Sequence, residues 1–537
     1  MKTVAVVGAG AGGIAAVKAC LDEDLSPVCF EQSSNIGGLW FYRDDVPPGQ
    51  GCVAKTTTAN TSKELTAFSD FPMPRDFPNY PHHAEMQRYM ELYADHFDVR
   101  RHVRFDHEVV GVTPAADYDD TGRWTVEVKD RKSGDVTRED FDAVMIANGH
   151  HWEPNRPRLD GEDVFKGRVI HSLQYRDHRG YEDKTVVVVG IGNTGGDIAM
   201  DLSRIAKRVY ISTRRGAWIV RRIGGGGIPI DVVGIRRFIF DIMGRLPTGW
   251  LNSLTESFVN QAFDHDLYGL RPKHRFHEQH PTVNDDLPNR IACGTVIVKP
   301  NIAHLTAAGV QFDDGSCVDD VDVVVLATGY TFSFPFLSES ILSVKDNMVE
   351  LYRRVFPPHL KHPSLAVIGR MQQLGSVFPI VEMQSRWATR VFKGLCVLPS
   401  SDAMRAYIKQ QHLEQERLHL PTLRHTMEVL WLPYLDELAR EIGCRPNLAR
   451  LMLIDPTLAM SCYFGPAAAY QFRLEGPGKW TEARETVLTT WERIYYPLNK
   501  KRAEELAQKR TRSGYGSYLK ILAVLLVLVA VCIMWFR

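Results

Sequence analysis

The chain has 537 residues, enough for two or three domains, and its 44% apolar content is ample for buried cores. Lysine plus arginine and aspartate plus glutamate number 64 each, so the composition gives no sign of a polyanion partner such as nucleic acid. The nine cysteines form no C-x-x-C pair, which argues against a zinc ribbon or a redox-active disulfide and favours a reducing compartment.

The chain opens with an apolar strand and a glycine fingerprint. Residues 3–7 lead into Gly8-Ala9-Gly10-Ala11-Gly12-Gly13, the G-x-G-x-x-G pattern of dinucleotide-binding units. The glycines allow a tight turn, a close approach to a pyrophosphate and close packing of the next helix, whose N-terminus receives the phosphate charge. Further on, Glu31 would accept hydrogen bonds from a ribose 2′-hydroxyl and repel a 2′-phosphate. This site is predicted to bind FAD or NAD.

The same pattern occurs a second time after residues 185–189. It reads Gly190-Ile191-Gly192-Asn193-Thr194-Gly195 and continues with Gly196 and Asp197. Where the first copy has its acid, the second has Arg214 and Arg215. Their planar, permanently charged guanidinium groups suit a 2′-phosphate, so the second unit is predicted to bind NADPH.

The other predicted elements complete an α/β fold with two nucleotide-binding units. An apolar strand ending in glycine should close each unit, and the chain should return to the first unit near its end. In chain order we expect a strand at 142–149, a proline-bearing crossover at 151–157, a mainly helical insertion at 216–290, strands at 322–329 and 365–369, and helical, charged segments over 402–501.

The C-terminal residues 518–536 are predicted to form a transmembrane tail anchor. They are apolar apart from Lys520, which can snorkel, and Tyr518 and Trp535 suit the membrane interfaces. A buried or amphipathic helix is the alternative, but no polar face is visible. Lys2 leads directly into the first strand, so no signal peptide is expected. Basic residues precede the anchor and place the body on the cytosolic side: Lys500, Lys501, Arg502, Lys509, Arg510 and Arg512.

Four further motifs lie outside the two glycine fingerprints. Phe165 to Arg176 match the pattern F-x-G-x-x-x-H-x-x-x-(Y/F)-(K/R). The other three are Gly37-Gly38-Leu39-Trp40, Asn60-Thr61-Ser62-Lys63-Glu64 and Ala327-Thr328-Gly329-Tyr330. With these motifs the chain resembles the flavin-containing monooxygenases. The resemblance to the animal microsomal members, of the dimethylaniline monooxygenase type, runs nearly from end to end and includes the hydrophobic tail.

The resemblance implies two Rossmann-like domains, one for FAD and one for NADPH, and a C-terminal membrane-anchoring helix. The expected division is 1–153 for the first part of the FAD domain, 154–215 for the first part of the NADPH domain, 216–290 for the helical insertion, 291–330 for the second part of the NADPH domain, 331–510 for the return to the FAD domain with the C-terminal helices, and 518–536 for the anchor.

The resemblance also implies an oxygenase reaction in two stages. NADPH reduces FAD, NADP⁺ stays bound, and the reduced flavin takes up molecular oxygen as a C4a-hydroperoxide. This species transfers one oxygen atom to a soft nitrogen or sulfur nucleophile of a small lipophilic molecule, as in xenobiotic metabolism. The expected location is the endoplasmic reticulum membrane, with the body facing the cytosol. A homo-oligomer is compatible with the sequence.

The roles of single residues follow from the same resemblance. Gly8 through Gly13 and Glu31 are expected to bind the pyrophosphate and ribose of FAD. The flavin is expected to be bordered by Leu39, Trp40, Ala59 and Thr61. The second fingerprint, from Gly190 to Asp197, is expected to bind NADPH, and Arg214 and Arg215 are expected to bind its 2′-phosphate. Asn60 is the expected catalytic residue, because its neutral amide can donate to the hydroperoxide or to NADP⁺ without adding a charge.

Two local patterns compete with this assignment. Asn60-Thr61-Ser62 is also a glycosylation sequon, but a glycan there would require a lumenal body and would block the flavin contact. His274, His277 and His280 invite a metal site, yet spacing by three drifts off one helix face and no cysteine completes a ligand set. No metal is expected.

Three other functions share some of these features. A Baeyer–Villiger monooxygenase has both nucleotide folds but oxygenates ketones, and this alternative stays open. A disulfide reductase also binds FAD and NADPH but needs a cysteine pair beside the flavin, which the sequence lacks. A catalytically inactive flavoprotein that senses or merely oxidises NADPH at a membrane is the third.

Overall fold

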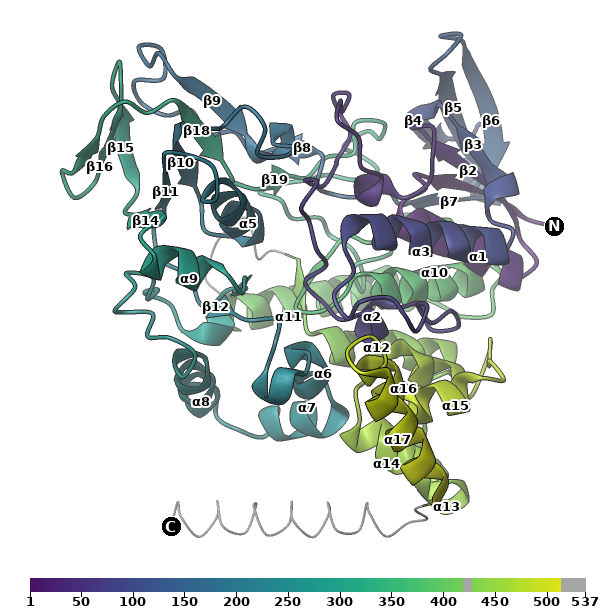
Figure 1. Cartoon of the computed structure of the whole chain (residues 1–537). Coiled ribbons are helices and arrows are strands. Elements are labelled where there is room, and N and C mark those ends of the chain that lie inside the picture. Colours follow the sequence, from purple (N-terminus) through teal and green to yellow (C-terminus); the bar gives the residue numbers. More distant parts are fainter. Residues whose placement is uncertain (419–426, 513–537) are drawn as a thin grey trace.

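The computed structural model describes residues 1–418 and 427–512. Two five-stranded parallel sheets lie in the upper half of the molecule, and helices of the central and C-terminal parts of the chain lie beneath them (Figure 1). The predicted α/β fold with parallel sheets is confirmed. The predicted anchor at 518–536 lies outside the described residues. None of the helices within the described ranges has the length and apolar character that crossing a membrane requires.

The first parallel sheet has the strand order β20-β7-β1-β2-β3. Its strands are β1 (Thr3–Val7), β2 (Ser26–Glu31), β3 (Val103–Phe105), β7 (Ala143–Ile146) and β20 (Leu365–Val367). β20 pairs in parallel with β7 although more than two hundred residues of chain separate them (Leu365 lies opposite Val144). The strand expected at 365–369 therefore completes the sheet that begins at Thr3.

The second parallel sheet repeats the arrangement of the first. Its order is β14-β11-β10-β18-β9, with β10 in the central place that β1 has in the first sheet. Its strands are β9 (Arg168–His171), β10 (Thr185–Val189), β11 (Arg208–Ser212), β14 (Val296–Lys299) and β18 (Val323–Leu326). The edge strand β9, which lies beside β18, comes first along the chain in this unit. The matching edge strand of the first sheet, β20, lies beside β7 and comes last along the chain. The internal repeat thus extends over whole sheets, well beyond the two glycine fingerprints.

Each parallel sheet is accompanied by a three-stranded antiparallel sheet, which comes directly before β7 in the first unit and directly before β18 in the second. In the first unit this sheet has β4 (His107–Pro114), β5 (Trp124–Asp130) and β6 (Val136–Phe141); in the second it has β15 (Ile302–Leu305), β16 (Val310–Phe312) and β17 (Cys317–Val318). Two-stranded pairs complete the sheet structure: β8 (Glu153–Pro154) with β19 (Tyr330–Thr331), β12 (Ile219–Val220) with β13 (Thr282–Val283), and β21 (Gln372–Gln373) with β22 (Glu428–Val429).

Helices cover the parallel sheets. α1 (Ala11–Asp22) follows β1 and packs against α10 (Phe378–Phe392) and α3 (His83–His96), while α5 (Asn193–Leu202) follows β10 and contacts α9 (Leu287–Ala292). Short helices α2 (Lys63–Thr66) and α4 (Tyr118–Thr121) lie in the first unit. Because nearly every side chain of α10 is buried, this helix forms the centre of the core beneath the first sheet.

The insertion at 216–290 packs against the C-terminal helices as well as the second unit. It contains α6 (Ile230–Gly234), α7 (Arg237–Met243) and α8 (Thr248–Asn260). α7 contacts α14 (Pro456–Phe464), and Arg237 forms a buried ion pair of 2.6 Å with Asp436 of α12 (Trp431–Ile442). The sequence pattern predicted an insertion within the second unit, and the structure adds that this insertion also contacts α12 and α14.

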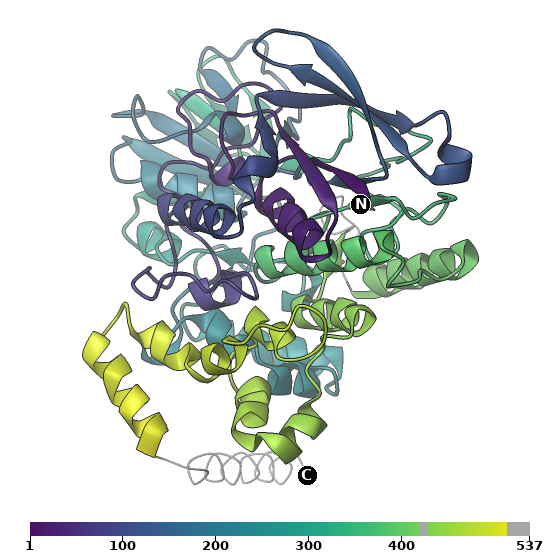
Figure 2. The same ribbon diagram turned by 90° about the vertical axis from the view of Figure 1, so that its right-hand side faces the viewer.

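The remaining helices follow α10 along the chain, and the last of them, drawn in yellow, lies at the lower edge of the molecule and contacts the helix before it (Figure 2). They are α11 (Ser401–Leu418), α13 (Leu448–Ile454), α15 (Ala483–Leu488), α16 (Thr490–Tyr495) and α17 (Lys500–Arg512). Single 3-10 turns are η1 (Gly38–Trp40), η2 (Arg100–His102), η3 (Ser172–Gln174), η4 (Gly225–Gly227), η5 (Phe276–Glu278) and η6 (Ala469–Arg473).

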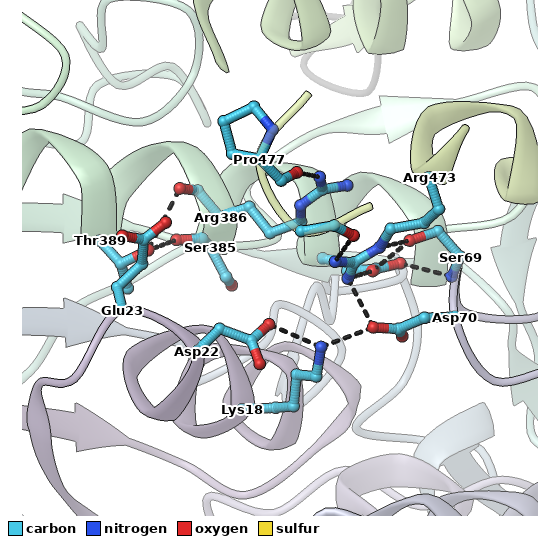
Figure 3. A network of polar contacts seen from close by, with 12 residues as sticks. Lys18, Asp22, Glu23, Ser69, Asp70, Ser385, Arg386, Thr389, Arg473 and Pro477 are labelled. Carbon is cyan, nitrogen blue, oxygen red and sulfur yellow. Dashed lines mark hydrogen bonds and ion pairs between the residues drawn. The ribbon is translucent and has the colours of Figure 1, made fainter. Parts of the chain in front are cut away.

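A buried network of charges joins this C-terminal region to the first unit (Figure 3). Arg473 of η6 lies 2.8 Å from Asp70 and 2.6 Å from Glu382 of α10, and Lys18 of α1 lies 2.5 Å from Asp70. The side chain of Arg473 is only 2% exposed. Because breaking a buried ion pair leaves an uncompensated charge, this network strongly favours one arrangement of the four segments.

Candidate active site

The two glycine fingerprints form the same turn. Gly8 and Gly190 both have positive φ values, 94° and 105°. A Cβ atom on Gly13 would lie 1.7 Å from the Gly8 carbonyl oxygen, and one on Gly195 would lie 2.0 Å from that of Gly190. Only glycine allows both the turn and the close contact between strand and helix.

The helices that follow the turns have open N-termini. α1 is preceded by Gly10 and α5 by Gly192, and neither residue provides a side-chain cap. The first N–H groups of such a helix have no partner within the helix, and the helix dipole favours negative charge there. Each turn is therefore suited to a phosphate group.

One cavity of about 1810 Å³ reaches both turns. This volume exceeds that of common single-ligand sites and leaves room for two nucleotides. Of the residues predicted from the sequence, those that line it are Gly8, Gly10, Ala11, Gly12, Glu31, Leu39, Trp40, Ala59, Asn60, Thr61, Gly190, Gly192, Asn193, Thr194, Asp197, Arg214 and Arg215. Four others lie behind its wall, in the fingerprint turns and helices: Ala9, Gly13, Gly195 and Gly196.

Glu31 is tied to the first fingerprint by its own carboxylate. It ends β2, and its side chain accepts hydrogen bonds from Ala9 N (2.7 Å) and Ser33 N (2.8 Å). The residue is 6% exposed and faces the cavity. A carboxylate has lone pairs for more than two donors, so the two backbone contacts fix its position and leave it able to accept from a ribose.

Leu39 and Trp40 lie in η1, directly against the first fingerprint. A Cβ atom added to Gly38 would lie 3.1 Å from Gly10 Cα. The two glycines therefore bring the backbone of η1 onto the fingerprint turn. This contact places Leu39 and Trp40 in the cavity beside the open end of α1.

Arg214 and Arg215 follow the end of β11 at the matching place of the second unit. Both are exposed and line the cavity. Within the described part of the chain, neither guanidinium is paired with a carboxylate in the structure's ion pairs and hydrogen bonds. Two unpaired guanidinium groups beside a phosphate-binding turn form a suitable site for a further phosphate.

Asp197 lies on α5, near the open helix end of the second unit. Burial raises the pKa of its carboxyl to about 6, against the lowering effects of Arg222 and of a hydrogen bond from Asn284. Asn284 Nδ2 donates to Asp197 Oδ1 at 2.9 Å. Asp197 therefore connects α5 to the residue that follows β13, which the sequence did not predict to reach the site.

Asn60 lies in the cavity on a loop held from both sides. Ala59 N donates to Pro81 O (2.8 Å), and Ser62 N donates to Asp231 Oδ2 (2.6 Å). Arg222 Nη2 donates to Asn60 Oδ1 (2.7 Å). Sequence reasoning missed Arg222, because it belongs to no motif and meets Asn60 across 162 residues of chain.

The cysteines exclude a dithiol site in this cavity. All those in the described ranges are free, and among them Cys52 alone lines the cavity. A disulfide reductase needs two cysteines in contact with the flavin. The arrangement therefore contradicts that alternative.

His171 and Arg176 of the F-x-G-x-x-x-H-x-x-x-(Y/F)-(K/R) motif make structural contacts. His171 Nδ1 accepts from Leu173 N (3.1 Å) and caps η3, while its Nε2 lies 3.0 Å from Gly329 O. Arg176 Nη1 donates to Tyr175 O at 3.1 Å. The contact of His171 with Gly329 joins the start of the second unit to the strand end after β18, whereas the contact of Arg176 is local.

Comparison with known proteins agrees with this geometry. The family model described as flavin-binding monooxygenase-like matches residues 1–536. Dimethylaniline monooxygenase [N-oxide-forming] 2 of Rattus norvegicus is 43% identical over 532 residues, which cover 99% of this chain and 98% of the relative. Flavin-containing monooxygenase 5 of Homo sapiens is 42% identical over 534 residues, 98% of this chain and 99% of the relative.

Solved structures show the same architecture. S-allyl-L-cysteine S-oxygenase from Allium sativum has a TM-score of 0.63 and 28% identity, covering 84% of this chain and 92% of that one. Cyclohexanone monooxygenase from Rhodococcus sp. Phi1, bound to NADP⁺, shares the fold with a TM-score of 0.59 at 20% identity, covering 82% and 97%. The chain belongs to the flavin-binding monooxygenase-like family and is a flavin-dependent monooxygenase that uses FAD and NADPH.

Proposed function

We propose that this monooxygenase transfers one oxygen atom to a soft nitrogen or sulfur nucleophile of small lipophilic molecules. The observation that carries the proposal is the neutral amide of Asn60 in a cavity that both nucleotide turns share. Relatives support it by name, since one forms N-oxides and another oxygenates the sulfur of S-allyl-L-cysteine.

The first unit fits FAD. A Cβ atom on Gly8 would lie 2.8 Å from Ala147 O, so only glycine allows the backbone to pass this close to Ala147. The open end of α1 would hold the pyrophosphate, Glu31 the ribose, and Leu39 and Trp40 would border the flavin. Reduced FAD supplies the reaction with molecular oxygen, which no protein side chain provides.

The second unit fits NADPH. The open end of α5 would hold the pyrophosphate, and Arg214 with Arg215 would hold the 2′-phosphate. This assignment also supports the proposed division into an FAD domain (1–153 and 331–510) and an NADPH domain (154–215 and 291–330) separated by the insertion at 216–290. One cavity then lets the nicotinamide approach the flavin.

Asn60 is proposed as the catalytic residue. An uncharged amide can donate a hydrogen bond to an oxygen atom or to NADP⁺ without supplying a proton. A protonated acid in its place would deliver a proton and favour release of hydrogen peroxide. Thr61 and Ala59 would border the same part of the cavity. A glycan on Asn60 is incompatible with this role.

We also propose attachment to the endoplasmic reticulum membrane, with the body on the cytosolic side. Basic residues of α17 precede the apolar segment 518–536 in the sequence. On α8, Trp250, Leu254 and Phe258 are each more than half exposed and recur at helical spacing, which is typical of a face that meets an apolar phase. α8 and α13 lie on the lower side of the molecule, away from both sheets (Figure 1).

Product identification tests the proposed substrate class. Purified holoenzyme is incubated with NADPH and oxygen, once with an aliphatic thioether and once with an aliphatic ketone. The sulfoxide is the expected product, and ester from the ketone without any sulfoxide would contradict the proposal. That outcome would assign Baeyer–Villiger chemistry to the same scaffold.

A further inference from the structure

Arg222 and Asp285 meet at one edge of a small parallel sheet inside the insertion. Arg222 follows β12 and Asp285 follows β13, each two residues beyond its strand. Because the two strands are parallel, their carboxyl ends lie together. Arg222 Nη1 donates to Asp285 Oδ2 (2.9 Å), and Arg222 N donates to Asp285 Oδ1 (2.8 Å). This pair fixes the guanidinium in one orientation.

The rest of the guanidinium faces the loop that carries Asn60. Arg222 Nε donates to Ala59 O (3.3 Å), and Nη2 donates to Asn60 Oδ1 (2.7 Å). The side chain of Arg222 is 13% exposed, so water competes little for these contacts. A hydrogen bond from a charged donor in such surroundings is among the strong ones.

The chemistry of the two groups decides how the Asn60 amide points. A guanidinium has only donors, whereas an asparagine amide has one acceptor oxygen and one donor nitrogen. The oxygen must therefore face Arg222, which turns the Nδ2 group the other way. Nδ2 has no hydrogen-bond partner among the described residues, and Asn60 lines the cavity. Its two donors are available to a ligand.

The backbone around Asn60 has anchors besides Arg222. Contacts of Ala59 N with Pro81 O and of Ser62 N with Asp231 hold the loop on both sides of Asn60. The torsions of the Asn60 side chain are what remain to be fixed. The contact from Arg222 acts on these torsions.

The same edge is connected to the second nucleotide turn. Val283 N donates to Asn193 Oδ1 (2.7 Å), and Asn284 Nδ2 donates to Asp197 Oδ1 (2.9 Å). Asn193 and Asp197 belong to α5, which carries the proposed NADPH phosphate site. Contacts therefore run from α5 through β13 and Asp285 to Arg222 and Asn60.

We infer that Arg222 is a positioning residue that holds the donor edge of the Asn60 amide toward the cavity and links its orientation to the NADPH-binding helix. The inference rests on the proposed catalytic role of Asn60. Arg222 itself need not touch substrate or cofactor, since it acts through the amide.

The test compares full-length holoenzyme variants. R222Q removes the charge, whereas R222K keeps a charge but has one donor nitrogen in place of three. N60A and N60A/R222Q test whether the two residues act together. R221Q is the matched control, since the neighbouring Arg221 contacts Ala262 O instead. Three quantities are measured: hydrogen peroxide released per NADPH oxidised with a thioether present, the NADP⁺ affinity by calorimetry, and the unfolding midpoint.

We expect R222Q to raise the peroxide fraction several-fold and to change the NADP⁺ affinity in the same direction and by a similar factor as N60A. R222K should lie between R222Q and the wild type, and R221Q should match the wild type. N60A/R222Q should be no worse than N60A, because two residues that act through one group are not additive.

Equal behaviour of R222Q and R221Q, or additive losses in the double variant, would overturn the inference. If R222Q does not fold, R222K and D285N carry the test, since D285N leaves the guanidinium but removes its anchor. A wild type that forms no oxygenated product would instead contradict the proposed function, and the calorimetric comparison of R222Q with N60A would still decide the role of Arg222.

Discussion

Arg473 Nη2 lies 2.6 Å from Glu382 Oε1, and this contact fixes the C-terminal region to the central helix of the first unit. Both side chains are almost fully buried, at 2% and 3% exposure. Asp70 shares the same nitrogen at 2.8 Å. The region around Arg473 is thus fixed to the unit that carries the first glycine fingerprint.

Replacing Arg473 should destabilise the protein strongly. R473M leaves the buried Glu382 without its ion-pair partner and Asp70 with Lys18 alone, and we expect a loss of about 3–5 kcal/mol in unfolding free energy. R445M is the control, because Arg445 pairs with Asp436 while 45% exposed and should cost less than about 1 kcal/mol. Chemical denaturation of both variants measures the difference; equal losses would contradict a structural role for the buried network.

Replacing Arg214 should change the choice of nicotinamide nucleotide. R214A removes a guanidinium proposed for the 2′-phosphate, so the KM for NADPH should rise by about tenfold, while the KM for NADH should change little. R208A, at the other end of β11, is the control and should leave both unchanged. Steady-state kinetics with each nucleotide provide the test, and an equal loss with NADPH and NADH would refute the assignment.

Replacing Asn60 should separate NADPH oxidation from oxygen transfer. N60A keeps both nucleotide turns, so NADPH should still bleach the flavin under anaerobic conditions at a similar rate. Sulfoxide formation should fall and hydrogen peroxide should rise, because the amide donor is gone. N499A, an exposed asparagine on the surface, serves as control. Unchanged product per NADPH in N60A would count against the catalytic role.

The sequence was sufficient to predict the two nucleotide turns because their geometry depends on local residues. Gly13 and Gly195 contact the carbonyl of a glycine five residues earlier, so spacing alone reveals the turn. Glu31 and the pair Arg214 and Arg215 also lie at a fixed distance from their turns, at the ends of the next strands. These residues predicted FAD or NAD for the first unit and NADPH for the second, and the family resemblance added Asn60 and the choice of FAD.

The contacts of the insertion could not be predicted, since they depend on tertiary packing. Arg222 resembles any other basic residue in the sequence, and only the pairing of β12 with β13 brings it to Asp285 and Asn60. Likewise, Arg237 finds Asp436 across the molecule. Apolar periodicity shows that these helices are amphipathic but does not reveal which surface they cover.

His265 should make the stability of the insertion depend on pH. Burial lowers the pKa of its imidazole to about 4. Its Nε2 accepts from Ile219 N (2.9 Å), and its Nδ1 lies 2.7 Å from Asn260 Oδ1. The folded pKa lies below the unfolded value, so neutral His265 stabilises the fold fully above pH ~6.5. This contribution, up to about 3 kcal/mol, is lost as the pH falls toward 4.

H265Q tests this pH dependence. The difference in unfolding free energy between the wild type and H265Q should be largest near neutral pH and should shrink toward pH 4, because protonation weakens only the wild type. Denaturation curves at several pH values measure it. A constant difference across this range would contradict the expected titration of His265.

Oxygen labelling tests the central claim that both nucleotides and molecular oxygen react in one cavity. Purified holoenzyme is given NADPH, ¹⁸O₂ and an aliphatic thioether, and the sulfoxide is analysed by mass spectrometry. The structure predicts one labelled oxygen in each sulfoxide and NADPH consumption that matches product formation. Unlabelled sulfoxide, or NADPH consumption that yields hydrogen peroxide alone, would contradict the account.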